Sequence, residues 1–411
     1  MPEGRKQILF VDDDPMVLEA LRDRLRRYRN KWDMFFVTSG EEALAETEKR
    51  QIDVVVSDMR MPKMDGAELL QHLQKNRPEI VRIILSGYAE LEAAMRAVPV
   101  AHQFLAKPVE PQKLEEVIER ACSLQVFLKN ETIRSLAGRL NTLPSVPRLY
   151  AELTRILADE NTGVEKVADV VEKDLAMCAK ILQIVNSSFF GFPRRITNIR
   201  NAISYLGLNM IRNLSLSAGV FASGTKPAPA GLSLETLQLH SMFVATLAMN
   251  LMQKDLPLKA QDAFLAGLLH DLGQLILAVG LEDEYAQVLQ RSKEVSSPIH
   301  EVERQMLHAT HAEVGAYVLG IWGLPYPIVE AVAYSHSPDA ASLQELDLVA
   351  VVFISNCLHH QAVCKGMEKA NRYTNDLDNF VSIRNWQSLH ETWKGMASAL
   401  NIDIALQDPR S

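Results

Sequence analysis

A histidine and an aspartate stand side by side in the otherwise apolar run FLAGLLHDLGQLIL, at His270 and Asp271. Imidazole nitrogens and carboxylate oxygens bind zinc, iron and manganese, and a metal ion held in this way can activate water for phosphoester hydrolysis. Two adjacent ligands do not complete such a site. Whether the pair binds a metal ion therefore depends on residues that other segments of the chain supply.

A second set of polar residues follows apolar segments near the start of the chain. Asp12 and Asp13 follow ILFV, Asp58 follows VVVS, Ser86 ends RIILS and Lys107 ends QFLAK. The carboxyl ends of parallel strands meet in one crevice, so we expect these side chains to lie together. Three carboxylates repel one another unless a hard cation such as Mg²⁺ binds among them. The added hydroxyl and ammonium suit a phosphoryl group.

The elements that must position this second set alternate between short apolar strands and amphipathic helices. Alternation of this kind predicts parallel pairing, and we expect a doubly wound α/β domain with a five-stranded sheet. The expected helices include 16–28 and 111–125. The expected strands are 8–11, 35–37, 54–57, 82–86 and 103–107.

Strand signals stop after residue 125, and the chain shows helical periodicity nearly throughout to residue 400. A break rich in proline, alanine and glycine at 225–233 is expected to divide this all-α part into two lobes. The predicted divisions are an α/β domain over 1–125, a helical linker over 126–138, a helical bundle over 139–225 and a helical lobe over 233–400.

Composition restricts the classes of partner. The formal net charge of −8 disfavours non-specific binding to nucleic acid or to an anionic membrane. The four cysteines form no CxxC pair, which is typical of reduced thiols in the cytoplasm. The start of the chain runs directly into a strand, so no signal peptide is expected. The stretch 264–281 is interrupted by polar residues, and we expect one buried helix there and not a membrane span.

Residues 6–122 resemble a response-regulator receiver domain, because the acid pair, the single aspartate, the serine and the Lys-Pro pair follow successive strands in order. The resemblance implies that Asp58 accepts a phosphoryl group from a sensor histidine kinase. It also implies that Asp12, Asp13, Asp58 and the backbone carbonyl of Arg60 hold Mg²⁺. Such a transfer depends on charge neutralisation and alignment more than on acid–base chemistry.

The same resemblance assigns three further roles. Lys107 would pair with the phosphoryl oxygens, and Ser86 would turn toward them after phosphorylation. Phe104 stands at the position of the aromatic residue whose rotation accompanies that movement. Phosphorylation is expected to change the face formed by the fourth and fifth strand–helix units.

The helical part resembles the HD-related output domain, HDOD, a signalling module often fused to receivers. The matching motifs extend over about 140–360, and Leu175 is one departure because the family usually has proline after Asp174. The motifs are LPSVP, KILQIVNSSFFG, RRITNIRNAISYLG, GLLHDLGQLIL and HAEVGAYVLGIWGLP. A chain of this kind implies a bacterial two-component regulator with a protein partner downstream and no DNA-binding element.

The second lobe of HDOD is related to the HD phosphohydrolases, and this relation implies a ligand set. Ser335-His336 replaces a histidine doublet of related phosphodiesterases, and SPDAASLQ replaces their GYP-type signature. Asn356 falls where the superfamily has its last metal carboxylate, and an amide oxygen is a weaker ligand. We therefore expect a degenerate site, no HDOD cofactor and no enzyme. The implied positions are His240, His270, Asp271, His311, His336 and Asn356.

The sequence thus predicts a response regulator in which phosphorylated Asp58 controls a non-catalytic, protein-binding HDOD output. One alternative is a metal-dependent phosphohydrolase acting on a cyclic dinucleotide, which metal content and turnover would reveal. Another is a nucleotide sensor, which would bind without hydrolysis. A stripe at heptad spacing suggests either a homodimer contact or packing on the receiver's own sheet. The stripe comprises Leu114, Val117, Ala121, Leu124 and Leu128.

Overall fold

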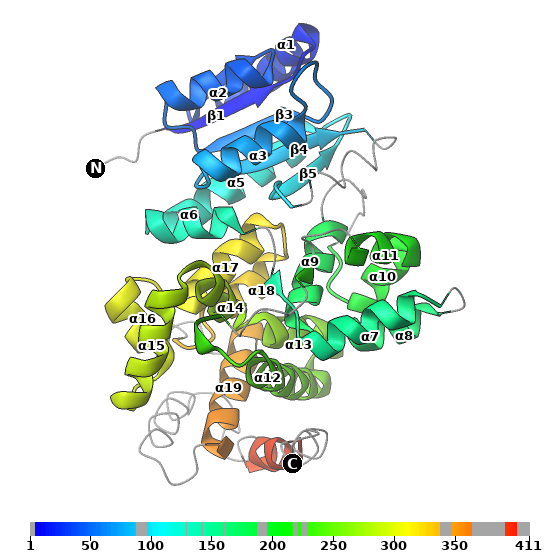
Figure 1. The fold of residues 1–411 in the computed structure, drawn as a ribbon, viewed down its shortest axis with the longest axis vertical. Helices are drawn as coiled ribbons and strands as arrows, with labels where there is room; N and C mark the ends of the chain where they lie inside the picture. The colour runs from blue at the N-terminus through cyan, green and yellow to red at the C-terminus, as the bar shows by residue number, and fades with distance from the viewer. Residues whose placement is uncertain are drawn as a thin grey trace. The chain divides into compact units, whose positions relative to one another are not determined.

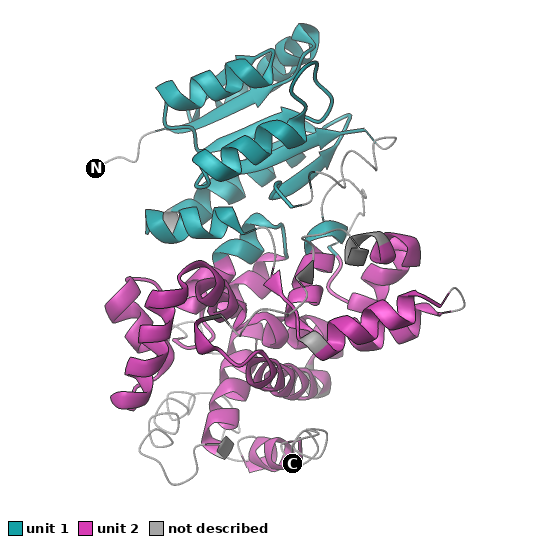
Figure 2. Cartoon of the chain, in the orientation of Figure 1, with its two compact units in different colours: residues 1–142, 183–195, 317–324 teal, residues 143–182, 196–316, 325–411 magenta. Residues whose placement is uncertain are grey.

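The computed structural model forms two compact units (Figures 1 and 2). The first comprises 1–142, 183–195 and 317–324, and the second comprises the remaining residues. The residues that the structure describes are 5–87, 97, 99–128, 130–140, 143–159, 162–186, 195–216, 221–222, 229–337, 347–363 and 391–400.

The first unit contains the predicted five-stranded parallel sheet, in the order β2-β1-β3-β4-β5 (Figure 1). Its strands are β1 (Lys6–Val11), β2 (Trp32–Val37), β3 (Val54–Asp58), β4 (Val81–Ser86) and β5 (Gln103–Ala106). Its helices include α1 (Pro15–Arg24), the 3₁₀ turn η1 (Arg26–Tyr28), α2 (Gly40–Lys49), α3 (Gly66–Asn76), α5 (Pro111–Phe127) and α6 (Glu131–Arg139). The α/β prediction is confirmed.

Local sequence explains where helix α3 begins. Asp65 accepts a hydrogen bond from the Glu68 N–H, and the Glu68 carboxylate accepts one from the Asp65 N–H, which is a capping box. A Cβ atom at Gly66 would lie 2.2 Å from the carbonyl oxygen of Asp58. Glycine is therefore required here, because the start of α3 approaches the end of β3 so closely.

The stripe along α5 is buried within the chain. Leu114, Val117, Ala121 and Leu128 are each no more than 2% exposed, and Leu124 is half-buried. Side chains buried in this way cannot also form an exposed coiled-coil seam. This burial matches the interpretation that the stripe packs within the chain, and it does not match the alternative of a homodimer contact.

The predicted linker helix is held against the receiver sheet by a buried arginine. Arg82 on β4 is 1% exposed, and its guanidinium donates to the carbonyl oxygens of Val100 (2.7 Å), Pro78 (3.1 Å) and Gly138 (2.6 Å). Gly138 belongs to α6. Burial lowers the pKa of Arg82 to about 9, although the charges of Tyr317 and Glu79 act in the opposite direction.

Replacing Arg82 with methionine is expected to lower the free energy of unfolding by about 2–4 kcal/mol, because several buried carbonyl groups lose their donor. Urea unfolding of Arg82→Met beside the exposed-site control Arg24→Met would measure the difference. If both variants had the same urea midpoint of unfolding as the wild type, Arg82 would not hold the linker helix against the sheet.

Where the structure describes it, the second unit consists of helices and one short pair of parallel strands, which the sequence did not predict. The strands are β6 (Leu143–Pro144) and β7 (Phe221–Ala222), and the 3₁₀ turns are η3 (Pro229–Gly231) and η4 (Pro257–Lys259). The helices of the HDOD region are α7 (Pro147–Leu157), α8 (Val164–Val171), α9 (Leu175–Val185), α10 (Ile199–Leu206), α11 (Leu208–Leu216), α12 (Leu234–Asp255), α13 (Ala260–Leu269), α14 (Leu272–Gly280), α15 (Glu282–Glu294), α16 (Ile299–Leu307), α17 (His311–Ile321), α18 (Tyr326–Ala333) and α19 (Leu348–Val363). Helices α9 and α17 each contribute residues to both compact units.

Helix α9 begins at Leu175, the position that departs from the family pattern. The Asp174 side chain accepts hydrogen bonds from the N–H groups of Met177 (2.9 Å) and Val146 (2.8 Å). The helix start is therefore capped without proline.

The apolar stretch 264–281 is buried as predicted, but the expectation of one continuous helix was wrong. Helix α13 ends at Leu269 and α14 begins at Leu272, so His270 and Asp271 occupy the turn between them. Residues 257–280 are long and apolar enough to cross a membrane, yet 83% of the most apolar window is buried inside the structure.

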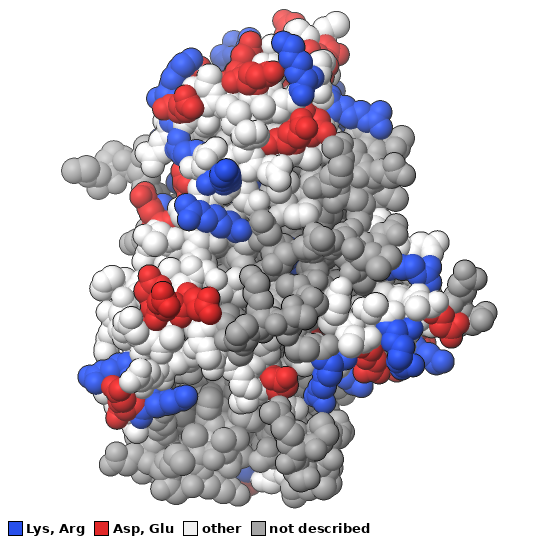
Figure 3. All heavy atoms as spheres, in the orientation of Figure 1, with Lys and Arg blue, Asp and Glu red and all other residues white. Residues whose placement is uncertain are grey.

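Charged side chains of both signs are interspersed over the described part of the face shown in Figure 3.

Candidate functional sites

The first site lies at the carboxyl end of the five-stranded sheet. Asp12 follows β1, Asp58 ends β3 and Lys107 follows β5. The Lys107 ammonium donates to Asp12 Oδ2 at 2.8 Å and forms an ion pair with Asp58 Oδ1. Asp58 Oδ2 accepts the backbone N–H of Arg60 at 2.8 Å. The predicted convergence of these strand ends is present.

Burial changes the pKa values of the charged groups in this site. Asp12 and Asp58 are only 2% and 6% exposed. Burial raises the pKa of Asp58, and the hydrogen bond and charge of Lys107 offset this only in part. Burial also opposes the charge on Lys107, but its hydrogen bonds to both carboxylates outweigh burial and raise its pKa. One ammonium thus serves two buried carboxylates.

The remaining receiver residues lie around this pair. Asp13 is exposed beside Asp12, and Arg60 lies in the loop after β3. Ser86 ends β4 with no exposed surface, and its Oγ lies 3.4 Å from the carbonyl oxygen of Gly87. Phe104 on β5 is 5% exposed and therefore points inward. The predicted switching face includes residues 88–96, which lie outside the described residues.

The donor set fits a magnesium ion. The available ligands are carboxylate and carbonyl oxygens, which Mg²⁺ prefers, and two of the carboxylates are buried at adjacent strand ends. The Asp12 charge also raises the pKa of Asp58, so a cation would relieve their repulsion. Lys107 supplies only one positive charge to this pair.

The second site surrounds the turn between α13 and α14. Asp271 lies at its centre, with Oδ2 3.3 Å from His240 Nε2 and Oδ1 3.3 Å from His270 Nε2. Oδ1 also lies 3.1 Å from His311 Nε2 and 3.4 Å from His336 Nε2. Two sets of three residues converge closely enough to hold a metal ion, and Asp271 belongs to both. The sets are His240, His270 and Asp271, and Asp271, His311 and His336.

A glycine lets two distant segments meet in this site. A Cβ atom at Gly273 would lie 1.8 Å from the carbonyl oxygen of His311, so the start of α14 contacts the start of α17 through backbone atoms. This close approach brings His311 beside Asp271. Substitution of Gly273 would separate the two segments.

Outer hydrogen bonds fix the orientation of two imidazoles. His270 Nδ1–H donates to the carbonyl oxygen of Gly267 at 2.7 Å, and His311 Nδ1–H donates to Glu303 Oε2 at 2.7 Å. Glu303 is fully buried and also accepts the Tyr285 hydroxyl at 2.8 Å. With Nδ1 engaged in this way, Nε2 faces Asp271, which is the arrangement that outer partners of metal-binding histidines impose.

The pKa values divide the histidines into two kinds. Burial lowers the pKa of His270 and of His336 to about 4, so both are neutral at physiological pH. Burial also acts against the His311 charge, but Glu303 and Asp271 raise its pKa to about 10. Burial alone would raise the pKa of Asp271, yet the surrounding histidines lower it well below its usual value.

Asn356 on α19 lies behind His336. Its Nδ2 lies 3.3 Å from His336 Nδ1 and 3.4 Å from the carbonyl oxygen of Ser335. Its Oδ1 is buried and has no hydrogen-bond partner among the described residues. Asn356 thus contacts the ring of a candidate ligand from outside the two converging sets.

Several residues of this site were not predicted from the sequence. His240 Nδ1 lies 2.9 Å from His359 Nδ1, and the His300 ring stacks on His336 with centroids 4.7 Å apart. These rings and His360 line a cavity of about 450 Å³ that reaches Asp271. The doublet CLHH was a visible signal for two of them, whereas nothing local marks Glu303.

Comparison with protein families finds two matches in order along the chain. The response regulator receiver domain matches residues 8–119, and the HDOD domain matches residues 143–338. An uncharacterized protein of Treponema pallidum is 25% identical over 275 residues, which cover 66% of this chain and 52% of the relative. The transcriptional regulatory protein ZraR of Escherichia coli O157:H7 is 28% identical over 199 residues, 45% of each chain. The chain spans about half the length of these two relatives.

Solved structures also resemble parts of the chain. The MmoQ response regulator of Methylococcus capsulatus is 18% identical, with a TM-score of 0.48, and the match covers 61% of this chain and 97% of that one. The signal receiver domain of an HD domain-containing protein from Pseudomonas fluorescens is 28% identical, with a TM-score of 0.29 over 30% of this chain and 98% of that one.

Proposed function

Because the chain belongs to the response regulators that join a receiver domain to an HDOD domain, we propose that phosphorylation of Asp58 switches a non-catalytic HDOD output. The single observation that carries the proposal is the arrangement of Asp12, Asp58 and Lys107 at the carboxyl end of the sheet. Asp58 is the carboxylate at the end of the central strand β3. A sensor histidine kinase is the proposed phosphodonor.

The proposed reaction is transfer of a phosphoryl group from phosphohistidine. A carboxylate oxygen of Asp58 attacks phosphorus, the P–O bond forms as the P–N bond breaks, and the leaving imidazole nitrogen takes a proton. Asp12, Asp13, Asp58 and the Arg60 carbonyl would hold Mg²⁺, which supplies neutralisation of charge on the phosphoryl oxygens. Lys107 would pair with those oxygens, and the backbone N–H of Arg60 orients the Asp58 carboxylate.

The switch must act on the output by shifting a conformational equilibrium. Moving a population from almost entirely inactive to almost entirely active requires a preference of about 5 kcal/mol for the active state. Ser86 lies on β4, which pairs with β3, and Phe104 lies on β5, the strand beyond it; both are buried, and they are the residues proposed to respond to the phosphoryl group. The output would be recognition of a partner protein by the HDOD helices.

The histidine cluster supports a second candidate, a metal-dependent HD-type phosphohydrolase. Four imidazole Nε2 atoms lie within 3.1–3.4 Å of Asp271, and a cavity opens beside them. A non-catalytic nucleotide sensor would use the same cavity. We favour the non-catalytic output because Asn356 is an amide, and because the GYP-type signature is missing after His336.

Incubation of the full chain with a small-molecule phosphodonor such as phosphoramidate is expected to add one phosphoryl group per chain only when Mg²⁺ is present. Intact-mass spectrometry would measure the modification, and EDTA added before the donor should prevent it. Affinity capture with the phosphorylated and unphosphorylated chain would then test the output. Equal labelling with and without Mg²⁺ would contradict the proposed metal role.

A further inference from the structure

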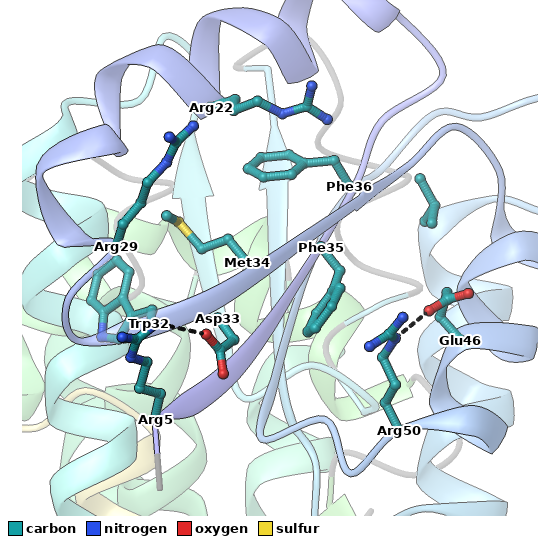
Figure 4. A pocket seen from close by; sticks show the side chains of 11 residues that line it. Arg5, Arg22, Arg29, Trp32, Asp33, Met34, Phe35, Phe36, Glu46 and Arg50 are labelled. Atoms are coloured by element: carbon teal, nitrogen blue, oxygen red, sulfur yellow. Dashed lines mark hydrogen bonds and ion pairs between the residues drawn. The ribbon is translucent and has the colours of Figure 1, made fainter.

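The edge strand β2 carries a groove that the proposed switch does not use. Strand β2 lies at the end of the sheet and pairs with β1 alone. The groove beside it has a volume of about 800 Å³ (Figure 4). Its lining includes four arginines, namely Arg5, Arg22, Arg29 and Arg50.

The backbone of β2 offers hydrogen-bonding groups along this groove. The Val37 carbonyl points toward β1, because it accepts the Asp12 N–H at 3.3 Å. Successive residues of a strand direct their N–H and C=O groups to opposite sides. Met34 and Phe36 therefore direct theirs away from β1, toward the open edge. An edge of this kind is a template for another strand.

Aromatic rings and guanidinium groups border both sides of the edge. The Arg22 guanidinium lies 4.8 Å from the centre of the Phe36 ring, and that of Arg50 lies 4.3 Å from the centre of the Phe35 ring. Figure 4 shows each arginine beside its ring. These stacked contacts hold the side chains at the border of the strand while their N–H donors stay available.

The positive charge of the groove is only partly neutralised. Arg5 pairs with Asp33 at 3.4 Å, and Arg50 pairs with Glu46 at 2.7 Å. Arg22 and Arg29 have no ion pair within the described part of the chain, and both are exposed. Arg22 lies in α1 and Arg29 directly follows η1, so the excess positive charge lies on that side of β2.

We propose that β2 is a docking edge for an extended acidic segment of a partner protein, which adds as a sixth strand. The added strand would pair with the outward N–H and C=O groups of Met34 and Phe36. Acidic residues at every second position would face Arg22 and Arg29. A second copy of this chain fits less well, because two β2 edges paired about a two-fold axis would bring the same arginines together.

The test uses the full chain and a fluorescent peptide of about eight residues that alternates glutamate and threonine. Fluorescence anisotropy should show binding that is at least about tenfold weaker for the lysine–threonine counterpart. Methylation of alternate backbone nitrogens should also weaken binding at least about tenfold, because the added strand loses its donors. Equal binding of the methylated and unmodified peptides would overturn strand addition.

Variants test the location. The double variant Arg22→Glu with Arg29→Glu should weaken peptide binding at least about tenfold, whereas Arg24→Glu with Arg26→Glu should stay within about twofold. Both pairs are exposed on the same segment and change the net charge equally. Unchanged binding by the first pair would overturn the site. Light scattering could instead show that the chain is a dimer and that the peptide dissociates it. That result would assign the β2 edge to a second copy of this chain and would overturn the proposed partner.

Discussion

Replacement of Asp58 with asparagine is expected to abolish phosphorylation of the chain by small-molecule donors. The amide lacks the anionic oxygen that attacks phosphorus, so no acyl phosphate forms. Its side chain has nearly the same size and still accepts the Arg60 N–H that Asp58 accepts at 2.8 Å. Loss of labelling would therefore report the missing nucleophile and not a collapsed site. Intact-mass spectrometry, followed by peptide mapping of the wild-type label, measures the result.

Two further variants sharpen this prediction. Lys107→Gln should slow labelling by on the order of 10²-fold, because one charged donor to the transferred oxygens is lost. Asp23→Asn, an exposed carboxylate on α1, should label at the wild-type rate. A label mapped to another residue, or full labelling of Asp58→Asn, would show that the phosphoacceptor is misassigned.

The receiver fold could be predicted because its strands are short continuous apolar runs that end in polar residues. The strands β3 and β4 are buried along their whole lengths, as parallel central strands must be. The polar residue after each run then marks the carboxyl end of the sheet. This pattern predicts that Asp12, Asp58 and Lys107 lie together, and their contacts confirm the prediction.

The break between α13 and α14 could not be predicted in the same way. Apolar residues continue through both helices, and neither proline nor a polar cluster stands before His270. The contact beside the break is tertiary: Gly273, in the first turn of α14, lies against the backbone of His311, which is distant in the sequence. The sequence contains that glycine, but it does not show which segment will meet it.

Glu303 escaped prediction for a related reason. It lies in the amphipathic helix α16, where a glutamate ordinarily faces solvent, yet it is 0% exposed. Its burial is stabilised by three donors, namely the His311 N–H, the His311 imidazole and the Tyr285 hydroxyl. No local sequence pattern predicts these hydrogen bonds, because Tyr285, Glu303 and His311 lie on three different helices.

The wild-type chain is expected to bind a divalent transition metal weakly at Asp271, so that purified protein contains less than one Fe, Mn or Zn per chain. The buried carboxylates of Asp271 and Glu303 are balanced in part by the imidazolium of His311, whose pKa is raised to about 10. A metal ion must displace that proton to use His311 Nε2, which lowers its apparent affinity. Elemental analysis measures the metal content.

Asp271→Asn should remove the bound metal, because Asp271 is the carboxylate common to both converging sets. His72→Gln, which replaces an exposed histidine on α3, should leave the metal content unchanged. The wild-type chain with added Fe, Mn or Zn should not hydrolyse cyclic di-GMP. Stoichiometric metal, with turnover lost on mutation of His240, His270 or Asp271, would instead establish an active phosphohydrolase.

Asn356→Asp is expected to tighten metal binding by roughly 10–100-fold, which is the range typical of changes around metal ligands. The Asn356 Nδ2 lies 3.3 Å from His336 Nδ1, and the neutral amide supplies no negative charge to favour a proton on that nitrogen. An aspartate would accept a hydrogen bond from Nδ1–H and would thereby turn the Nε2 lone pair toward the ion. Titration of the metal-free variant with Zn²⁺ beside wild type measures the change. Equal affinities would show that residue 356 does not control His336, and that weak binding has its origin in the His311 proton.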